Sequence, residues 1–296
     1  MRAAIRLTLL ALLLVTAGAV FVAEGALHIW HKERPDDALA AALARADDAG
    51  WRTVEVRAAD GIALSGWLFT PQHPNGAGVI ALHGVADTRL GMSGHADFLL
   101  RAGYTVLTPD CRGHGASGGD VISYGVREAG DITGWESLLL ATPGIDRIYG
   151  IGQSMGAAIL LESLARGNLL RALVADCPFA TFQEIAYERL DQQGLFGEVS
   201  SRPLVNFGFL YARVRYGVNL WSASPVNAIR ATHVPVLLIH GTKDTNIDPR
   251  HSRELHAANL ASTALWEVPG AGHIASLGVA RKEYIARVLA FFDAHR

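Results

Sequence analysis

The chain has 296 residues, half of them hydrophobic, which is enough for one large core or two smaller ones. Its formal net charge of −2 comes from interspersed acids and bases, so neither a basic surface for nucleic acid nor an acidic disordered tail is predicted. Two cysteines are too few for a disulfide framework, and the 12 histidines form no metal-binding motif, so we expect neither a metal nor a cofactor.

The first 30 residues differ in character from the rest. Two arginines precede an uncharged stretch from Leu7 to Ala23, whose length lies at the lower limit for a membrane span. Because positive charge is kept on the cytoplasmic side, residues 1–30 are predicted to be a single-pass anchor with the main domain outside the cytoplasm. One alternative is a signal peptide cleaved near Ala17–Ala19, which would give a secreted or periplasmic protein. A further alternative is a buried helix of the main domain. As an anchor or a signal peptide, the segment is not expected to be needed for the main domain to fold.

The next elements follow from local patterns. Residues 31–50 are predicted to be a linker helix, and the globular domain is expected to span 51–296. The alternating stretches at 53–58 and 62–69 predict an antiparallel hairpin. The run "GVIALHG" at 78–84 is continuously apolar, which is typical of a strand buried on both faces.

From residue 92 onward helices and strands alternate. Helices are expected near 92–102, 127–140, 154–166, 249–259 and 279–294, and strands near 104–110, 147–152, 172–176, 234–241 and 264–270. Single helices between strands imply right-handed crossovers and a parallel sheet. Residues 178–232 are too many for one such connection and are predicted to form a short cap. The fold class is therefore α/β, with about eight mostly parallel strands and helices on both faces.

The pattern G-x-S-x-G occurs twice, around Ser117 and around Ser154. Ser154 directly follows a buried type of strand and directly precedes an apolar helix. This setting lifts a serine hydroxyl to the carboxyl edge of a sheet, although a tight turn without chemistry has the same pattern. Ser117 has neither a buried type of strand before it nor an apolar helix after it, and it is interpreted as a loop residue. A serine nucleophile needs a base, and the base needs an orienting acid.

The carboxyl ends of later strands are where those partners belong. Asp244 and Asp248 follow the strand at 234–241, and His273 follows the strand at 264–270. The 29 residues from Asp244 to His273 are enough for one helix and one strand. Asp248 precedes a proline at a helix start, where it is predicted to cap the helix. We therefore predict Ser154 as nucleophile, His273 as base and Asp244 as acid.

An oxyanion formed at this serine needs two N–H donors. Met155, directly after the nucleophile, is predicted to supply one. Val85, in the loop after the strand at 78–84, is predicted to supply the other. His83 and His114 lie in neighbouring loops and are interpreted as loop-shaping residues.

Five motifs together resemble the α/β-hydrolase superfamily over Trp51 to Phe292: "LHG" (82–84), "DCRGHGASGG" (110–119), "GQSMG" (152–156), "HGTKDTNIDP" (240–249) and "GAGH" (270–273). The stretch "ADCPFATF" with a short cap, and the apolar N-terminus, are similar to the Bem46-like group of membrane-anchored serine hydrolases. The strand order of the superfamily implies that two strands separate Cys111 from Cys177. At about 4.8 Å per strand, that distance is too long for a disulfide.

The expected activity is hydrolysis of a carboxylic ester or thioester through an acyl-enzyme. A serine aminopeptidase or dipeptidase is an alternative, because acidic residues of the predicted cap could hold a substrate amine: Glu184, Glu188, Asp191 and Glu198. Acyl transfer to an acceptor other than water and non-catalytic binding are further alternatives.

The cap is also rich in large apolar side chains: Phe179, Phe182, Phe207, Phe209, Leu210, Tyr211 and Trp221. About half are expected to pack the cap onto the domain and the rest, Phe207 and Phe209 among them, to line an acyl pocket. Beside a membrane anchor, this favours a small-molecule or lipid-like ester as substrate.

Overall fold

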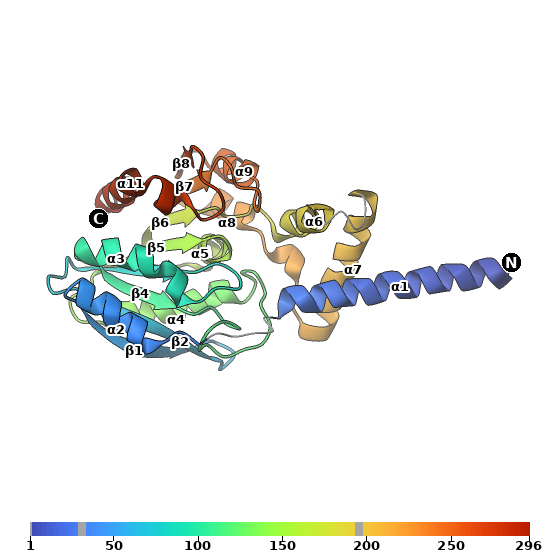
Figure 1. Ribbon diagram of the computed structural model, residues 1–296, viewed down its shortest axis with the longest axis horizontal. Helices are drawn as coiled ribbons and strands as arrows, with labels where there is room; N and C mark the ends of the chain where they lie inside the picture. The colour runs from blue at the N-terminus through green and yellow to red at the C-terminus, as the bar shows by residue number, and fades with distance from the viewer. Residues whose placement is uncertain (1, 29–33, 193–197) are drawn as a thin grey trace.

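The computed structural model describes residues 2–28, 34–192 and 198–296. Within them, eight strands form one sheet in the order β1-β2-β4-β3-β5-β6-β7-β8 (Figure 1). The pairs β1–β2 and β2–β4 are antiparallel, and all other pairs are parallel. The predicted eight-stranded, mostly parallel sheet is confirmed.

The strands follow the apolar runs of the sequence. Their bounds are β1 Gly50–Arg57, β2 Ala63–Thr70, β3 Ala77–Leu82, β4 Thr105–Pro109, β5 Arg147–Gln153, β6 Leu170–Asp176, β7 Val236–Gly241 and β8 Thr263–Val268. All six residues of β3 are buried, because β3 has a strand on each side and helices over both faces. β1 lies at the edge, and Val54 is its one buried residue. Cys111 and Cys177 are free and buried, and β3 and β5 separate their strands, as expected.

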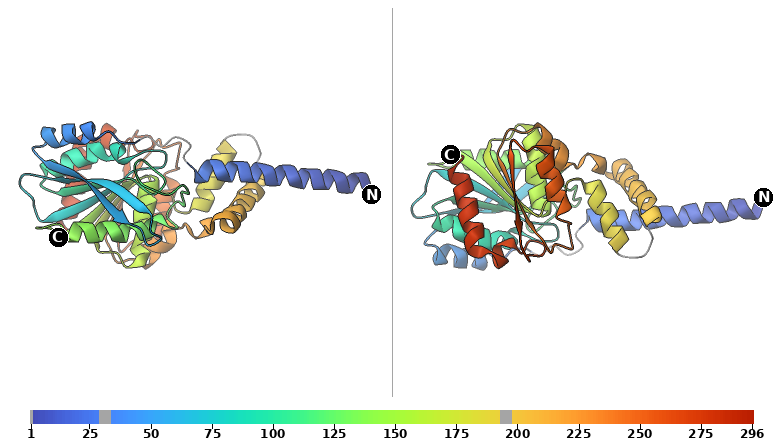
Figure 2. Two further views of the ribbon diagram at one scale, coloured as in Figure 1. Left: turned by 90° about the horizontal axis from the view of Figure 1, so that it is seen from below. Right: turned by 90° about the horizontal axis from the view of Figure 1, so that it is seen from above.

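Helices cover both faces of the sheet (Figure 2). One face carries α2 Asp37–Ala46, α3 Ser93–Arg101, α10 Ser276–Val279 and α11 Arg281–Asp293, and the other α4 Glu128–Leu140, α5 Met155–Ser163, α8 Pro225–Ala231 and α9 Arg250–Ala258. The predicted linker helix is part of this arrangement. α2 buries Ala40 and Ala44 in the core, and the indole N–H of Trp67 donates to the Asp37 carboxylate at 2.9 Å. Residues 31–33 of that predicted linker lie outside the described residues.

The cap is shorter than predicted. Between β6 and β7 the chain forms α6 Phe182–Gln192, α7 Glu198–Tyr216, a 3-10 turn at Leu220–Ser222, and then α8. α8 begins with Pro225 in its first turn and buries Ile229 in the same core as α5, so it is the ordinary crossover helix of the sheet. The cap is thus α6, α7 and the turn, which stand beyond the carboxyl edge of the strands (Figure 1).

The N-terminal helix α1 spans Arg2–Leu27 and extends from the domain past α7 (Figures 1 and 2). Its outer part exposes apolar side chains, among them Leu9 and Leu13. Its inner part buries Ala19, Ala23 and Leu27 in the apolar cluster of the cap. No helix among the described residues has the length and hydropathy needed to cross a membrane.

Candidate active site

Ser154 lies in the turn between β5 and α5, where the backbone is strained. Its φ of 52° and ψ of −118° lie outside the regions that side chains favour. The turn closes because two neighbours have no side chain. A Cβ at Gly152 would lie 2.7 Å from the nitrogen of Ala157, and one at Gly156 would lie 2.3 Å from the carbonyl oxygen of Leu82. The two glycines therefore allow strand and helix to approach closely enough to lift the Ser154 hydroxyl to the sheet edge.

The structure brings the three predicted residues together. Nε2 of His273 lies 3.0 Å from Oγ of Ser154, and Nδ1 of His273 lies 2.7 Å from Oδ2 of Asp244. Asp244 comes from the loop after β7 and His273 from the loop after β8, so three strand ends converge. With its Nδ1–H donated to the carboxylate, His273 has Nε2 available as an acceptor for the serine proton. The arrangement can activate Ser154 for attack on a carbonyl carbon.

Asp244 is held in its charged form. Burial alone would raise the pKa of Asp244, but hydrogen bonds from His240 and His273, and from the N–H of Ile247, outweigh burial and lower that pKa well below its ordinary value. The N–H groups of Asn246 and Ile247 donate to Oδ1 at 2.8 and 2.9 Å. A charged carboxylate fixes the tautomer of His273 and stabilises the imidazolium that forms when His273 takes a proton.

His240 supports this acid, and sequence reasoning missed its role. Its Nε2 lies 2.9 Å from the carbonyl oxygen of Ile247 and 3.2 Å from Oδ2 of Asp244. Since both are acceptors, Nε2 carries the proton, and Nδ1 accepts from the hydroxyl of Ser252 at 2.7 Å. The sequence contained a signal for this role, because His240 lies in β7, the strand that directly precedes the loop of Asp244.

Two other aspartates near the carboxyl edge of the sheet, Asp248 and Asp176, have structural roles. Asp248 accepts from the N–H of Arg250 at 2.8 Å, at the start of α9, where a helix-capping residue was predicted. Asp176 is fully buried and accepts from the hydroxyl of Ser276 at 3.2 Å, and burial raises the pKa of Asp176 to about 6. The hydrogen bonds of His273 go instead to Asp244 and Ser154.

The second G-x-S-x-G serine is also structural. Oγ of Ser117 donates to the carbonyl of Asp110 at 2.7 Å and accepts from the N–H of Ser65 at 2.9 Å. Ser117 is buried beside β2, so its hydroxyl closes a loop, as the sequence indicated.

The two predicted oxyanion donors border the same cavity as Ser154. Met155 is the first residue of α5, so its N–H has no acceptor within the helix. The loop of Val85 is fixed by the two histidines interpreted as loop-shaping. His83 accepts from the N–H of Cys111 at 3.0 Å, and His114 accepts from the N–H of Ala86 at 3.3 Å. Burial lowers the pKa of His114 to about 4, so His114 is neutral and can accept.

Cys177 adds a third potential metal ligand beside the acid and base. Its sulfur and ligand atoms of Asp244 and His273 lie within 4.8 Å of one another. However, burial raises the pKa of the Cys177 thiol, and Asp244 and His273 are already hydrogen-bonded to each other. The set is therefore arranged for proton transfer and not for a cation.

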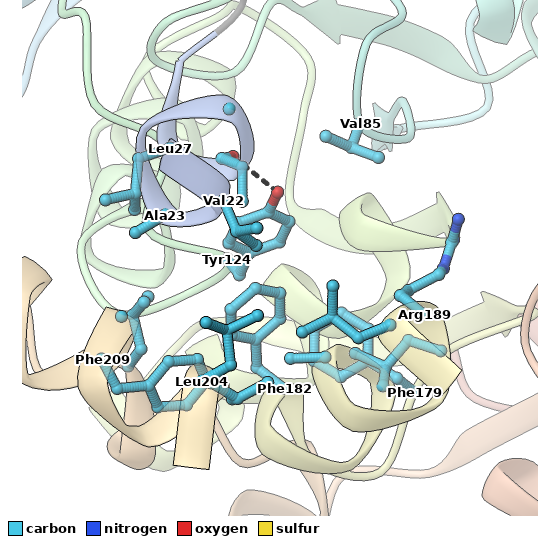
Figure 3. Close-up of a pocket in the computed structure, with 18 of the residues that line it drawn as sticks. Val22, Ala23, Leu27, Val85, Tyr124, Phe179, Phe182, Arg189, Leu204 and Phe209 are labelled. Atoms are coloured by element: carbon cyan, nitrogen blue, oxygen red, sulfur yellow. Dashed lines mark hydrogen bonds between the residues drawn. The ribbon is translucent and has the colours of Figure 1, made fainter. Parts of the chain in front are cut away.

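A cavity of about 520 Å³ opens above Ser154, between the sheet edge, the cap and α1 (Figure 3). Its lining is apolar, and Arg189 is the single charged side chain among its described lining residues. The prediction that Phe207 lines the pocket is wrong. Phe179, Phe182 and Phe209 line the cavity, whereas Phe207 is 39% exposed and does not. α7 turns Phe209 inward and Phe207 outward, as helical spacing requires.

Comparison with known proteins identifies the family. Residues 79–287 match the Alpha/beta hydrolase family, and the chain belongs to it. The uncharacterized protein YqkD of Bacillus subtilis (strain 168) is 30% identical over 241 residues, which cover 80% of this chain and 78% of that protein.

Two solved structures extend the comparison. The esterase Pf2001 of Pyrococcus furiosus has a TM-score of 0.70 and 26% identity, over 85% of this chain and 95% of that one. The acylaminoacyl peptidase of Pyrococcus horikoshii shares the fold, with a TM-score of 0.62 and 18% identity over 83% of this chain and 42% of its own.

Proposed function

We propose that the protein is a serine hydrolase that cleaves a carboxylic ester or thioester through an acyl-enzyme on Ser154. One observation carries the proposal: the hydrogen-bonded series Ser154, His273, Asp244 faces an apolar cavity of about 520 Å³. This volume lies within the range of small-molecule sites, roughly 300–1,000 Å³. The esterase among the solved structures supports the same class of reaction.

The reaction takes two half-steps. Oγ of Ser154 attacks the carbonyl carbon while Nε2 of His273 takes the hydroxyl proton, and the N–H groups of Val85 and Met155 receive the oxyanion. The tetrahedral intermediate collapses, the bond to the alcohol or thiol breaks, and His273 gives its proton to the leaving group. Water then attacks the acyl carbon while His273 takes its proton. The bond from this carbon to Oγ of Ser154 breaks, His273 returns the proton to Oγ, and the carboxylic acid leaves.

An ester suits this cavity better than a peptide with a free amine. An aminopeptidase would need a carboxylate near Ser154 to hold the substrate ammonium. Glu184 and Glu188 do not line the cavity, and both form ion pairs with Arg250. Asp191 also lies outside the lining, and the side chain of Glu198 is outside the described part of the structure.

Acyl transfer uses the same acyl-enzyme and differs only in the acceptor, so product analysis distinguishes it from hydrolysis. A non-catalytic binding role would leave the Ser154–His273 hydrogen bond and the depressed pKa of Asp244 without a use.

The location of the protein and its closer grouping remain proposals from sequence. Membership of the Bem46-like group rests on the motifs around Asp176 and on the apolar N-terminus. Attachment to a membrane with the domain outside the cytoplasm is supported by Arg2 and Arg6 at the start of α1 and by the exposed apolar side chains that follow. If fractionated cells contain only a shorter, freely soluble form, the cleaved-signal alternative holds.

A fluorophosphonate probe tests the activity directly. The full-length chain should be labelled, and Ser154→Ala should remove labelling and lower ester turnover by about 10⁶-fold. Ser117→Ala, the matched change in the other G-x-S-x-G, should be labelled normally if it stays folded. Labelling that persists in Ser154→Ala would place the nucleophile elsewhere.

A further inference from the structure

The cavity above Ser154 has a wall that does not belong to the hydrolase domain or to the cap. Seven of its described lining residues come from the inner part of α1: Ala19, Phe21, Val22, Ala23, Gly25, Ala26 and Leu27. This is a larger share than α6 or α7 contributes. Figure 3 shows the labelled residues of α1 facing those of the cap across the cavity, with Val22 directed toward the cap.

The inner part of α1 is fixed by the domain at its end. The hydroxyl of Tyr124 donates to the carbonyl of Ala26 at 2.7 Å, and the N–H of Ile122 donates to the carbonyl of Leu27 at 2.8 Å. These bonds use carbonyl groups that the end of a helix leaves without intrahelical partners. Both donors lie in the connection between β4 and α4, so one side-chain and one backbone hydrogen bond hold the end of α1 to the domain.

The cap fixes α1 from the side. The hydroxyls of Tyr211 and Tyr216 donate to Oε1 of Glu24 at 2.7 and 2.6 Å. The backbones also approach closely, because a Cβ at Gly208 of α7 would lie 3.4 Å from both the carbonyl oxygen of Ala19 and the Cβ of Ala23. A polar contact and close packing therefore act on the same helix pair.

We infer that α1 is the third wall of the acyl pocket and that Val22, on its pocket-facing side, limits the length of the acyl chain that reaches Ser154. The inference rests on the proposed function. Four of the seven wall residues are small, since Ala19, Ala23 and Ala26 carry only methyl groups and Gly25 carries no side chain. The larger side chains of the wall are Phe21, Val22 and Leu27. Few side chains of α1 therefore limit the space for an acyl chain. A larger residue at position 22 would occupy the space that the distal methylene groups of a long acyl chain need.

Acyl-length preference is the direct test. Full-length Val22→Trp is compared with the parent chain on p-nitrophenyl esters from acetate to palmitate. Each methylene that loses its place costs about fourfold in kcat/KM, so the ratio of long-chain to short-chain kcat/KM should fall more than tenfold when two are displaced. Val22→Ala should move the preference toward longer chains.

Val15→Trp is the matched control, because Val15 lies on the same helix, is exposed and does not line the cavity. Its length profile should equal that of the parent chain. An unchanged profile in folded Val22→Trp would overturn the inference. So would an equal shift in Val15→Trp, because the effect would then come from the helix as a whole.

A binding measurement separates this inference from the proposed function. In the Ser154→Ala background, a fluorescent long-chain fatty acid should bind, Val22→Trp should weaken binding more than tenfold, and Val15→Trp should not. If this binding pattern appears but the parent chain hydrolyses no ester, the proposed function is wrong, while the inference that α1 forms a wall of the pocket holds. If esters are hydrolysed but the fatty acid does not bind, or binds equally to both tryptophan variants, the inference that α1 forms a wall of the pocket is wrong.

Discussion

Gly156 is the position where a single methyl group should do the most damage to the site. A Cβ there would lie 2.3 Å from the carbonyl oxygen of Leu82 and 2.5 Å from that of His83. Ordinary contact begins near 3.4 Å, so α5 and β3 would have to separate by about 1 Å. Both obstructing atoms belong to the backbone, so no change of rotamer can relieve the overlap.

Two consequences follow for Gly156→Ala. Overpacking of this kind typically costs about 1–3 kcal/mol of folding free energy. Because Ser154 lies two residues away in the same turn, its hydroxyl should move by a similar distance relative to His273, and a misplacement of about 1 Å can lower a rate by about 10²-fold. The measurements are the urea midpoint and kcat/KM for p-nitrophenyl butyrate.

Gly278→Ala is the matched control. Gly278 lies in α10, and a Cβ there meets no atom within 4 Å. Its replacement should leave the rate unchanged and raise stability by about 0.4–1 kcal/mol, since alanine restricts the unfolded chain. If Gly156→Ala keeps the parent midpoint and rate, the close approach of β3 and α5 does not shape the turn as argued.

Three further predictions concern the acid, a buried carboxyl and α1. Asp244→Asn should lower kcat by roughly 10⁴-fold through the wrong tautomer of the base, and Asp248→Asn should not; the reverse result would identify a different acid. Burial and Glu128 raise the pKa of Glu162 to about 9, so the folded state keeps a proton that the unfolded state loses above about pH 4.5, and stability falls as pH rises between these values. Glu162→Gln should therefore raise the urea midpoint near pH 8 and leave it unchanged near pH 4; equal midpoints at both would contradict this. Leu27→Ala should cost about 2–5 kcal/mol, because Leu27 is fully buried; a loss below about 1 kcal/mol, measured in urea, would mean that α1 is not part of the folded unit.

The sequence predicted the sheet and the three strand-end residues because these follow from local patterns. Strands such as β3 are continuous apolar runs, and parallel strands bring their carboxyl ends to one edge whatever lies between them. Ser154, Asp244 and His273 could therefore be brought together from their place in chain order alone. Asp248 could be separated from Asp244 by the proline that follows it.

The role of α1 could not be predicted in this way. An apolar helix has the same pattern whether it faces lipid or the cap, and the partner that decides, α7, is far away in the chain. The expectation that the domain folds without residues 1–30 therefore ignored the burial of Ala23 and Leu27 against the cap. The sequence also could not show which of Phe207 and Phe209 faces the cavity, because the side of α7 that does so depends on packing and not on composition.

The distance along the chain between α1 and α7 has a consequence for how the protein is made. Glu24 is separated from Tyr211 and Tyr216 by 187 and 192 residues. At a synthesis rate of about 5–20 residues per second, the nascent chain exposes α1 for roughly 10–40 s before its binding surface on α7 exists. During this interval the inner and outer parts of the helix are equally available to a chaperone or a lipid surface. The pocket can therefore close only after synthesis has passed Tyr216 of the 296 residues, and whatever holds the nascent helix until then must release it.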